Sequence, residues 1–355
     1  MANNTARLGD LATYVNGYAF KPSDWGDTGL PIIRIQDLTG NSYQLNRYKG
    51  DYPARIEVND GDVLISWSAS LGVYVWQRGK ALLNQHIFKV VFDKFPINKD
   101  YFVFAVEHKL AEMESKTHGA TMKHIVKKDF DSTTIPYPAI EEQAEIAERL
   151  RRITALIEKQ QEQLLLLDQL VKSRFIELFG DPMTNPMGFP CYTVGDVIDF
   201  QGGSQPDKKY FEYEPTPDNI RLIQIRDYKS DKYITYIPRA MAKRFCTADD
   251  IMIGRYGPPI FQILKGIEGS FNVALMKATP KMGNREFVRQ FLKQDCLLEY
   301  LEGLSKRTAG QDGIQMDKLK AYPFPYPPIE LQEQFAAFVE QTDKSKLCGE
   351  MEVAA

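Results

Sequence analysis

The chain repeats one long pattern at a spacing of 189 residues. Residues 135–147 read IPYPAIEEQAEIA, and residues 324–336 read FPYPPIELQEQFA. In both copies a Pro-rich turn leads into a segment with helical character. A chain that carries two copies of one long unit is constrained to fold as two similar halves, each followed by its own helix.

Three further echoes occur in the same order and at similar spacings. They pair residues 8–11 with 194–197, residues 33–37 with 223–227, and residues 60–65 with 248–253. The repeat therefore extends over most of the 355 residues, a length sufficient for two or three domains.

Each half combines short β-type runs with one amphipathic helix. Runs rich in Val, Ile and Phe predict strands, and helical spacing of apolar residues after Asn98, a plausible N-cap, predicts a helix. The predicted strands are residues 31–38, 62–67 and 86–92, then 220–227, 250–254 and 273–276; the predicted helices are 98–116 and 285–304. The fold class is therefore mixed α/β (α+β), with one such domain in each half.

The segment between the halves carries a coiled-coil pattern. Ten positions alternate in steps of four and three, and eight of them are apolar. They are Ile146, Leu150, Ile153, Ile157, Gln160, Leu164, Leu167, Val171, Arg174 and Leu178. This pattern predicts a spacer helix over residues 141–179, roughly 58 Å long, that ends at Gly180.

The second helix begins in the same way and then loses the pattern. Its matching positions are Phe335, Val339, Thr342, Lys346 and Gly349, so we expect it to end at Gly349 and to be about half as long. The predicted organisation is a first domain over residues 1–140, a spacer helix over 141–179, a second domain over 180–329, and a short distal helix and tail over 330–355. The two spacer helices and two domains would form an internal pseudo-twofold repeat.

Composition indicates an ordinary soluble globular protein, with 43% hydrophobic and 26% charged residues. No run of about 18 apolar residues predicts a transmembrane helix, and the N-terminus lacks the apolar core of a signal peptide. The four cysteines are scattered, as reduced cytoplasmic thiols usually are. We therefore expect a cytoplasmic protein without a membrane partner.

The net charge of −3 argues mildly against a nucleic-acid partner, but its distribution does not. The predicted helices, residues 141–179 and 330–355, carry net charges of −2 and −4. The two domains therefore carry a modest basic excess of +3. This distribution permits DNA binding without demonstrating it.

The residues that would carry catalysis are missing from the sequence. An adenine methyltransferase needs an Asn/Asp-Pro-Pro-aromatic loop, and residues 181–183 (DPM) and 185–187 (NPM) lack the second proline and the aromatic residue. No glycine-rich cofactor loop or phosphate loop occurs, and the histidines lack metal-ligand spacing. We expect no catalytic residues, no cofactor and no metal.

The ordered set of motifs, present twice, resembles the specificity subunit (HsdS) of Type I restriction–modification enzymes. Residues 62–66 (DVLIS) and 250–257 (DIMIGRYG) resemble the strand-and-loop element of that family. Residues 119–123 (GATMK) resemble its Gly-x-Thr loop, and residues 338–346 resemble the start of its distal helix. The resemblance covers essentially the whole chain and departs from the family after Lys346.

The resemblance implies a non-catalytic subunit with two target-recognition domains, each reading half of a split sequence in double-stranded DNA. It also implies docking of methylation subunits (HsdM) and a restriction subunit (HsdR). Two similar domains on a rod can meet successive major-groove faces about 34 Å apart, so the rod would set the spacing of the half-sites.

DNA contacts are expected from polar and basic side chains in loops at matched positions of the two units. In the first unit these are Ser66, Ser68, Ser70, Lys116, His118, Thr121 and Lys123. In the second they are Ser204, Gln205, Lys208, Lys209, Arg255, Tyr256, Lys306, Arg307 and Gln311.

A short distal helix would leave part of the first helix unpaired. Antiparallel pairing with Phe335 near Leu178 would reach back only to about Gln160. The apolar stripe expected to bind another chain, either a methylation subunit or a second copy, consists of Ile146, Leu150, Ile153 and Ile157. The alternative is that this stripe packs on the first domain.

Two other functions remain open. One is a stand-alone adenine methyltransferase with a similar recognition domain, which the missing loops disfavour. The other is a coiled-coil scaffold without a DNA role, which a screen of split-site duplexes would distinguish from the leading interpretation.

Overall fold

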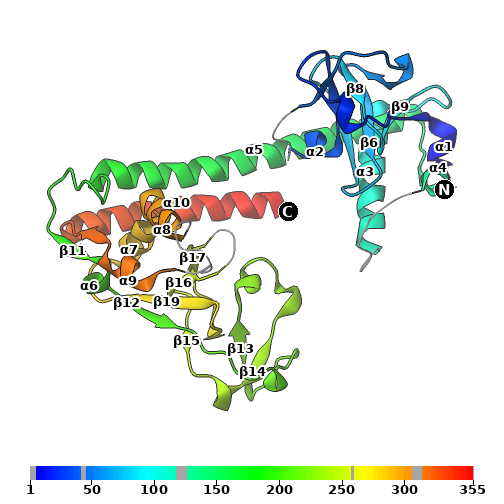
Figure 1. Cartoon of the computed structure of the whole chain (residues 1–355). Helices are drawn as coiled ribbons and strands as arrows, with labels where there is room; N and C mark the ends of the chain where they lie inside the picture. The colour runs from blue at the N-terminus through cyan, green and yellow to red at the C-terminus, as the bar shows by residue number, and fades with distance from the viewer. Residues whose placement is uncertain (1–4, 41–44, 117–125, 257–259, 306–313, 355) are drawn as a thin grey trace. The chain divides into compact units, whose positions relative to one another are not determined.

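The computed structural model describes residues 5–40, 45–116, 126–256, 260–305 and 314–354. The chain divides into two compact units, which comprise residues 1–157 and 158–355 (Figure 1). The division falls inside α5 (Ile140–Phe179), a single helix that belongs to both units. Each unit combines sheets and helices, so the mixed α/β fold class with an internal repeat is confirmed.

The described residues of unit 1 form two four-stranded sheets and one two-stranded sheet. Its strands are β1 (Thr5–Arg7), β2 (Thr13–Asn16), β3 (Leu30–Ile33), β4 (Arg47–Tyr48), β5 (Glu57–Val58), β6 (Val63–Ser66), β7 (Gly72–Val75), β8 (Ala81–Leu83), β9 (Ile87–Val91) and β10 (Thr134–Pro136). Its helices are α1 (Leu8–Leu11), η1 (Pro22–Asp24), α2 (Ile35–Leu38), η2 (Ala54–Ile56), α3 (Lys99–Lys116), α4 (Lys127–Ser132) and the first part of α5. The sheet orders are β2-β9-β6-β7, β4-β3-β8-β5 and β1-β10.

Unit 2 repeats this topology strand for strand. Its strands are β11 (Cys191–Thr193), β12 (Ile198–Gly202), β13 (Asn219–Ile223), β14 (Tyr236–Pro238), β15 (Phe245–Cys246), β16 (Ile251–Gly254), β17 (Gln262–Lys265), β18 (Gly269–Phe271), β19 (Leu275–Pro280) and β20 (Pro323–Pro325). The sheet orders are β12-β19-β16-β17, β14-β13-β18-β15 and β11-β20. Each unit has a parallel strand pair at the same place, β3 with β8 and β13 with β18.

Among the described residues, the helices of unit 2 follow an order similar to that in unit 1, with one more short helix and with two consecutive helices in the place of α3. They are α6 (Val194–Val197), η3 (Lys208–Tyr210), η4 (Ile225–Tyr228), η5 (Asp231–Tyr233), η6 (Arg239–Met241), α7 (Arg285–Leu292), α8 (Asp295–Ser305), α9 (Met316–Ala321) and α10 (Ile329–Ala354). The largest core of unit 2 packs α7 and α8 against β16 and β19, and also takes in the end of α5 and the start of α10. In unit 1 the apolar face of α3 packs on the sheet that contains β6 and β9.

The helix predicted over residues 141–179 is confirmed as α5. It ends where Gly180 adopts a φ of +73°, a left-handed conformation that glycine reaches without a Cβ penalty. Its last turns pack against α10 in antiparallel orientation, since Phe335 contacts Phe179 and Lys346 pairs with Asp168 (Figure 1). The helix predicted over residues 98–116 is also confirmed, and the Asn98 side chain accepts from the Tyr101 amide at 3.0 Å, as an N-cap does.

Two helix predictions were wrong. α10 continues through Gly349 to Ala354, so it has 26 residues against the 40 of α5. A glycine in a helix interior costs only about 1 kcal/mol, which the turns on either side can absorb. The helix predicted over residues 285–304 is interrupted after Leu292 and resumes as α8 at Asp295.

The strand predictions were right at their centres and too long at several ends. The predicted strands 62–67, 86–92 and 250–254 correspond to β6, β9 and β16. The predicted strands 31–38 and 220–227 each turn into a short helix after Ile33 or Ile223. Only the end of the predicted strand 273–276 is a strand, because β19 begins at Leu275. Among the residues described, no helix is long and apolar enough to span a membrane.

Candidate nucleic-acid interface

Four strands of unit 2 end at one place, which we call the strand-end edge. β12 and β16 flank β19 in antiparallel register, with Gly202 opposite Met276 and Gly254 opposite Leu275. Their carboxyl ends therefore lie side by side. β13 and β18 run parallel and end beside each other at Ile223 and Phe271. Loops that leave such an edge can present side chains together to one ligand.

Backbone hydrogen bonds join the two sheets at this edge. The Gly203 amide donates to the Leu275 carbonyl oxygen at an N–O distance of 3.1 Å. The Ser204 amide donates to the Phe271 carbonyl oxygen, also at 3.1 Å. The Asn272 amide donates to Ile223 at 3.0 Å. The loops after β12, β13 and β18 are thus held to one another by the main chain.

Unit 1 has the same edge with the same connections. The Gly17 amide donates to the Ile87 carbonyl oxygen at 3.1 Å, and the Tyr18 amide donates to the Leu83 carbonyl oxygen at 2.8 Å. The Asn84 amide donates to Ile33 at 3.1 Å. The repeat therefore preserves the construction of the edge, although most of its side chains differ.

A glycine is required where the two sheets cross at each edge. A Cβ on Gly203 would lie 1.9 Å from the Asn272 carbonyl oxygen. A Cβ on Gly17 would lie 1.9 Å from the Asn84 carbonyl oxygen. Both contacts are with the backbone and cannot be relieved by a side-chain rotation, so only glycine permits this approach.

Four of the residues predicted to contact DNA lie at the strand-end edge of unit 2. Ser204 is half-buried and Gln205 is exposed in the loop after β12. Arg255 follows β16, its guanidinium carbon lies 5.3 Å from the ring centre of Tyr256, and the Tyr256 side chain is 47% exposed. A cation stacked on an exposed aromatic ring can meet both a phosphate and a base.

Lys208 and Lys209 lie further along the same connection, in η3. Both are exposed, and Lys209 forms an ion pair of 3.5 Å with Asp207 while its ammonium lies 5.0 Å from the ring centre of Tyr210. These lysines are available for phosphate contacts. Lys306, Arg307 and Gln311 lie outside the described residues.

In unit 1 three predicted residues lie at the end of β6 and in the loop after it, with Ser66 as the last residue of the strand. Ser68 is half-buried and Ser70 is exposed. Ser66 is fully buried, and its hydroxyl donates to the Ser70 carbonyl. The prediction that Ser66 contacts DNA is therefore corrected: this side chain stabilises the loop that presents Ser68 and Ser70.

The remaining predicted contacts of unit 1 cannot be placed. His118, Thr121 and Lys123 lie outside the described residues. Lys116 is the last residue of α3, and only its backbone is described.

Sequence reasoning missed a pair of matched turns beside the two edges. Residues 31–38 and 221–228 have the same burial class at every position. Each run leaves its strand and turns, after Ile33 in unit 1 and after Ile223 in unit 2. In each, a buried aspartate accepts a hydrogen bond from the backbone amide three residues earlier: Asp37 from Arg34 at 2.8 Å and Asp227 from Gln224 at 3.3 Å. The repeat IRIQD and IQIRD was visible in the sequence, but its alternation indicated a strand.

In the second turn, burial shifts the pKa of the Asp227 carboxyl. Desolvation raises the pKa of this carboxyl, although the Gln224 amide and the Arg221 guanidinium oppose the shift. Arg221 lies 3.4 Å from the carboxylate and also pairs with Asp231 at 3.0 Å. Asp227 therefore acts as a structural anchor of the turn rather than as a ligand for DNA.

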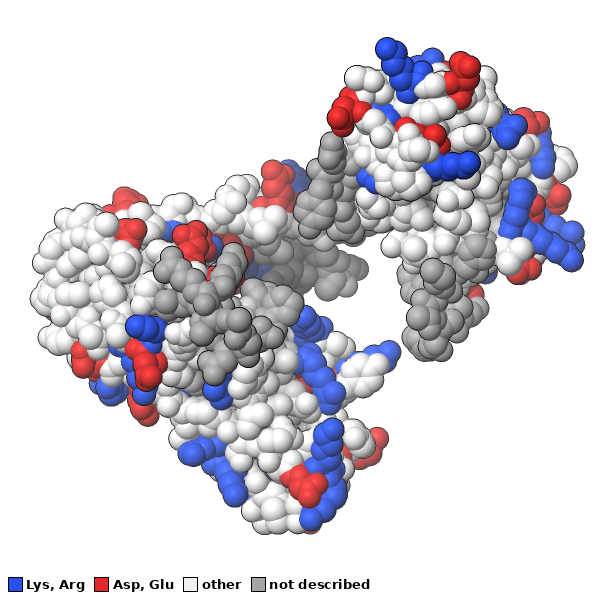
Figure 2. All heavy atoms as spheres, viewed as in Figure 1, with Lys and Arg blue, Asp and Glu red and all other residues white. Residues whose placement is uncertain are grey.

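Basic side chains gather over the part of unit 2 that contains β13 and β14 (Figure 2). The exposed members are Arg226, Lys229, Lys232, Arg239 and Lys243. A local excess of cations on a chain with net negative charge is the electrostatic pattern that favours a polyanion on this face.

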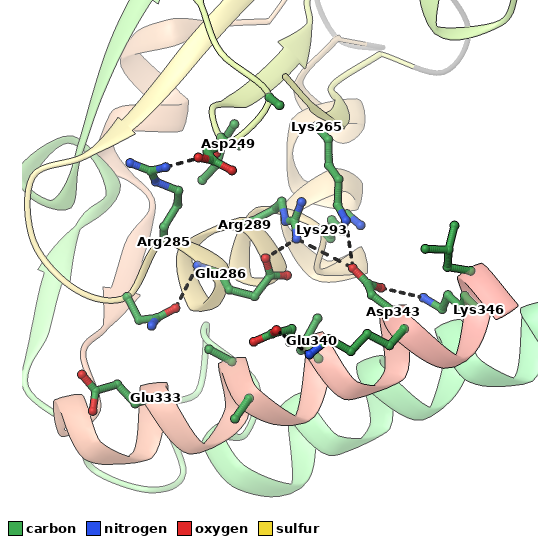
Figure 3. Close-up of a pocket in the computed structure, with 18 residues that line it drawn as sticks. Asp249, Lys265, Arg285, Glu286, Arg289, Lys293, Glu333, Glu340, Asp343 and Lys346 are labelled. Atoms are coloured by element: carbon green, nitrogen blue, oxygen red, sulfur yellow. Dashed lines mark hydrogen bonds and ion pairs between the residues drawn. The ribbon is translucent and has the colours of Figure 1, made fainter. Parts of the chain in front are cut away.

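A groove in unit 2 lies away from this edge (Figure 3). It has a volume of about 900 Å³ and lies between α7, α10 and the end of the β16–β17 hairpin formed by Ile251 and Lys265. Asp343 in the groove accepts from Lys265 at 3.0 Å and from Lys346 at 3.4 Å. These ion pairs link α10 to β17, so the groove joins α10 to the domain.

No group of His, Cys, Asp and Glu side chains suited to a metal ion occurs among the residues that the structure describes. The candidate interface comprises loops, amides and guanidinium groups at the two matched edges. The profile of the "Type I restriction modification DNA specificity domain" matches residues 3–166 and again residues 186–348. The chain belongs to this family.

Relatives of this Type I specificity family include two named subunits. The chain is 30% identical to the Type I restriction enzyme EcoBI specificity subunit of Escherichia coli over 168 residues, which are 46% of the chain and 35% of that subunit. It is 23% identical to the MjaVIII specificity subunit of Methanocaldococcus jannaschii over 370 residues, which are 95% of the chain and 85% of that subunit. The chain thus spans about a third of the first relative and most of the second.

Solved structures of the family share the fold. The S subunit of a Type I restriction–modification system from M. genitalium superposes with a TM-score of 0.55 at 15% sequence identity, over 99% of this chain and 92% of the other. A structure from work on complex assembly and conformational transition of the Type I system gives a TM-score of 0.54 at 16% identity, with the same coverage.

Proposed function

We propose that the chain is the DNA-recognition subunit of a Type I restriction–modification complex and that each unit reads one half of a split site. The observation that carries the proposal is the strand-end edge, built twice with the same hydrogen bonds and lined by different side chains. An interface that keeps its scaffold and varies its loops suits the recognition of two different sequences. The subunit itself carries no catalysis.

Residues 1–140 and 180–329 would be the two target-recognition domains, and residues 141–179 would be the ruler between them. The continuous helix α5 supports this role, because a single helix of 40 residues cannot change length between one DNA site and another. The distal segment, residues 330–355, would brace the end of this ruler through α10.

The working enzyme would also contain methylation subunits (HsdM) and a restriction subunit (HsdR), and it would act in the cytoplasm. The stripe proposed for partner binding is partly exposed on α5: Leu150 is 36% exposed and Ile153 52% exposed, while Ile146 and Ile157 are half-buried. Leu156 beside it is 63% exposed. Apolar side chains at this exposure support docking of another chain.

The test is selection of duplexes from a library with two random half-sites and a variable gap. We expect the full-length chain, alone or with its methylation subunits, to enrich two short sequences separated by a fixed gap. Enrichment of one continuous sequence would contradict the split site. Failure to enrich any duplex would favour a scaffold without a DNA role, and methyl transfer by the purified chain alone would favour a stand-alone methyltransferase.

A further inference from the structure

The matched turns beside the two edges differ in one exposed side chain. Gln36 occupies this position in unit 1, and Arg226 occupies it in unit 2. Each is preceded two residues earlier by a half-buried polar side chain, Arg34 or Gln224. In unit 1 the arginine is half-buried and the glutamine is exposed. In unit 2 the glutamine is half-buried and the arginine is exposed.

Arg226 is oriented by the side chains around it. Its Nη2 donates to Thr235 Oγ1 at 3.1 Å, and the same oxygen accepts from Gln224 Nε2 at 3.1 Å. Thr235 is fully buried, so this anchor is fixed. The guanidinium carbon also lies 6.0 Å from the ring centre of Tyr233. An arginine held in this way loses less entropy on binding than a free one.

A pair of parallel donors on Arg226 remains for a ligand. Thr235 accepts from one N–H of Nη2, so the second N–H of Nη2 remains, and among the described residues Nε and Nη1 have no hydrogen-bond partner. The neighbouring Arg221 differs, because two carboxylates hold its guanidinium and only 20% of its side chain is exposed. Arg226 is thus the guanidinium of this turn that can meet another molecule.

The turn holds Arg226 beside the strand-end edge. Its backbone is fixed by the Asp227 anchor, and Ile225 packs so closely on Gly254 that a Cβ there would lie 2.9 Å from the Ile225 Cδ1. Gly254 directly precedes Arg255. Arg226 and Arg255 therefore belong to adjoining loops of one face.

We propose that Arg226 reads a guanine in the major groove of the half-site bound by unit 2. The free N–H of Nη2 and the N–H beside it, from Nη1 or Nε, form two parallel donors that match O6 and N7 of guanine, and no other base presents two such acceptors there. Unit 1 has an amide at the matched position, and with its oxygen turned toward Arg34, Gln36 accepts from that guanidinium at 3.1 and 3.2 Å. The guanine contact is therefore specific to unit 2. This inference rests on the proposed function.

The decisive variant is Arg226→Lys, which keeps the positive charge and removes the two parallel N–H donors of the guanidinium. We expect roughly 5- to 150-fold weaker binding of the preferred duplex and loss of the preference for guanine at one base pair of one half-site. The dependence of affinity on salt should not change, because the number of neutralised phosphates is unchanged. The other half-site should be read as before.

Arg285→Lys is the matched control. Arg285 is also exposed, but it begins α7 after the carboxyl end of β19, whereas the strand-end edge lies at the start of β19. This variant should select the same duplexes as the wild type. Equal thermal unfolding of wild type and both variants would show that the fold is retained.

A different result would overturn the inference without touching the proposed function. If Arg226→Lys selects the wild-type sequence with wild-type affinity, Arg226 does not read a base. If Arg226→Ala then weakens all duplexes equally and lowers the salt dependence by about one counterion, the contact is to a phosphate. If the wild type itself selects no split duplex, the proposed function fails instead.

Discussion

Lys346 of α10 donates to Asp168 of α5, with its Nζ 2.6 Å from Oδ1. Nearer the start of α10, the Phe335 ring packs edge-to-face on Phe179 with centroids 5.3 Å apart. As α10 advances from Phe335 to Lys346, the partner position on α5 moves back from Phe179 to Asp168. The two helices are therefore antiparallel, and their register is fixed at two points.

Phe335→Ala should destabilise unit 2 by about 3–5 kcal/mol, because Phe335 is fully buried against Phe175 and Phe179 and its removal leaves a cavity. Urea unfolding measures this change. Leu347→Ala on the same helix is the control, since that side chain is 58% exposed and its loss should cost less than about 0.5 kcal/mol. Equal stability of the two variants would show that the paired helices do not support the domain.

Asp343→Asn should remove a pH-dependent part of the stability. Burial raises the pKa of Asp343, but hydrogen bonding to Lys265 and the charges of Lys265, Lys346 and Arg289 outweigh burial, so the pKa lies below its ordinary value. A carboxyl whose pKa is depressed by folding stabilises the native state above its unfolded pKa of about 3.9. That contribution disappears as the pH falls through the folded pKa.

The measurement is the free energy of unfolding at pH 7 and at about pH 3. Wild type should exceed Asp343→Asn at pH 7, and the difference should shrink at the acidic end. Glu333→Gln, an exposed acid on the same helix, is the control and should change stability by less than about 0.5 kcal/mol. A constant difference between wild type and Asp343→Asn at all pH values would contradict the role of this carboxylate.

Strong periodicity allowed α5 to be predicted, because its apolar positions repeat over many turns. The turns after Ile33 and Ile223 could not be predicted in the same way. Their alternating residues favour a strand, and a buried carboxylate that caps backbone amides outweighs that preference. The candidate site was accessible in part: Arg255 was predicted from its position in a loop after a predicted strand, and its DNA contact stays a prediction. Arg226 became a candidate only when the burial of its neighbours was known.

Gly203→Ala should disrupt the strand-end edge of unit 2, since the new methyl group would lie 1.9 Å from the Asn272 oxygen. We expect destabilisation by about 1–3 kcal/mol, as in other overpacked sites, together with weaker reading of one half-site. Gly303→Ala in α8 is the control. A Cβ there meets open space, so this variant should stabilise by about 0.5–1 kcal/mol. Thermal unfolding and duplex selection would measure both effects.

Insertion of one heptad at Gln160 should lengthen α5 by roughly 10 Å, or about three base-pair steps, while keeping its apolar face in phase. The preferred gap between half-sites should grow, and the bases of each half-site should stay the same. An insertion of three residues at the same place is the control, because it rotates the apolar face and should reduce stability. An unchanged gap in the heptad variant would mean that α5 is not the ruler.

Leu150→Glu should weaken the association of α5 with another chain. Leu150 and Ile153 are 36% and 52% exposed, and burying such apolar surface gains about 25 cal/mol per Å², which a carboxylate in the same interface would offset. Ala155→Glu is the control, because residue 155 lies on the opposite face of the helix at 100° per residue. Light scattering of each protein, alone and with methylation subunits, would measure the assembly. A wild type that stays monomeric alone, with a Leu150→Glu variant that still binds methylation subunits normally, would show that this stripe is not a docking surface.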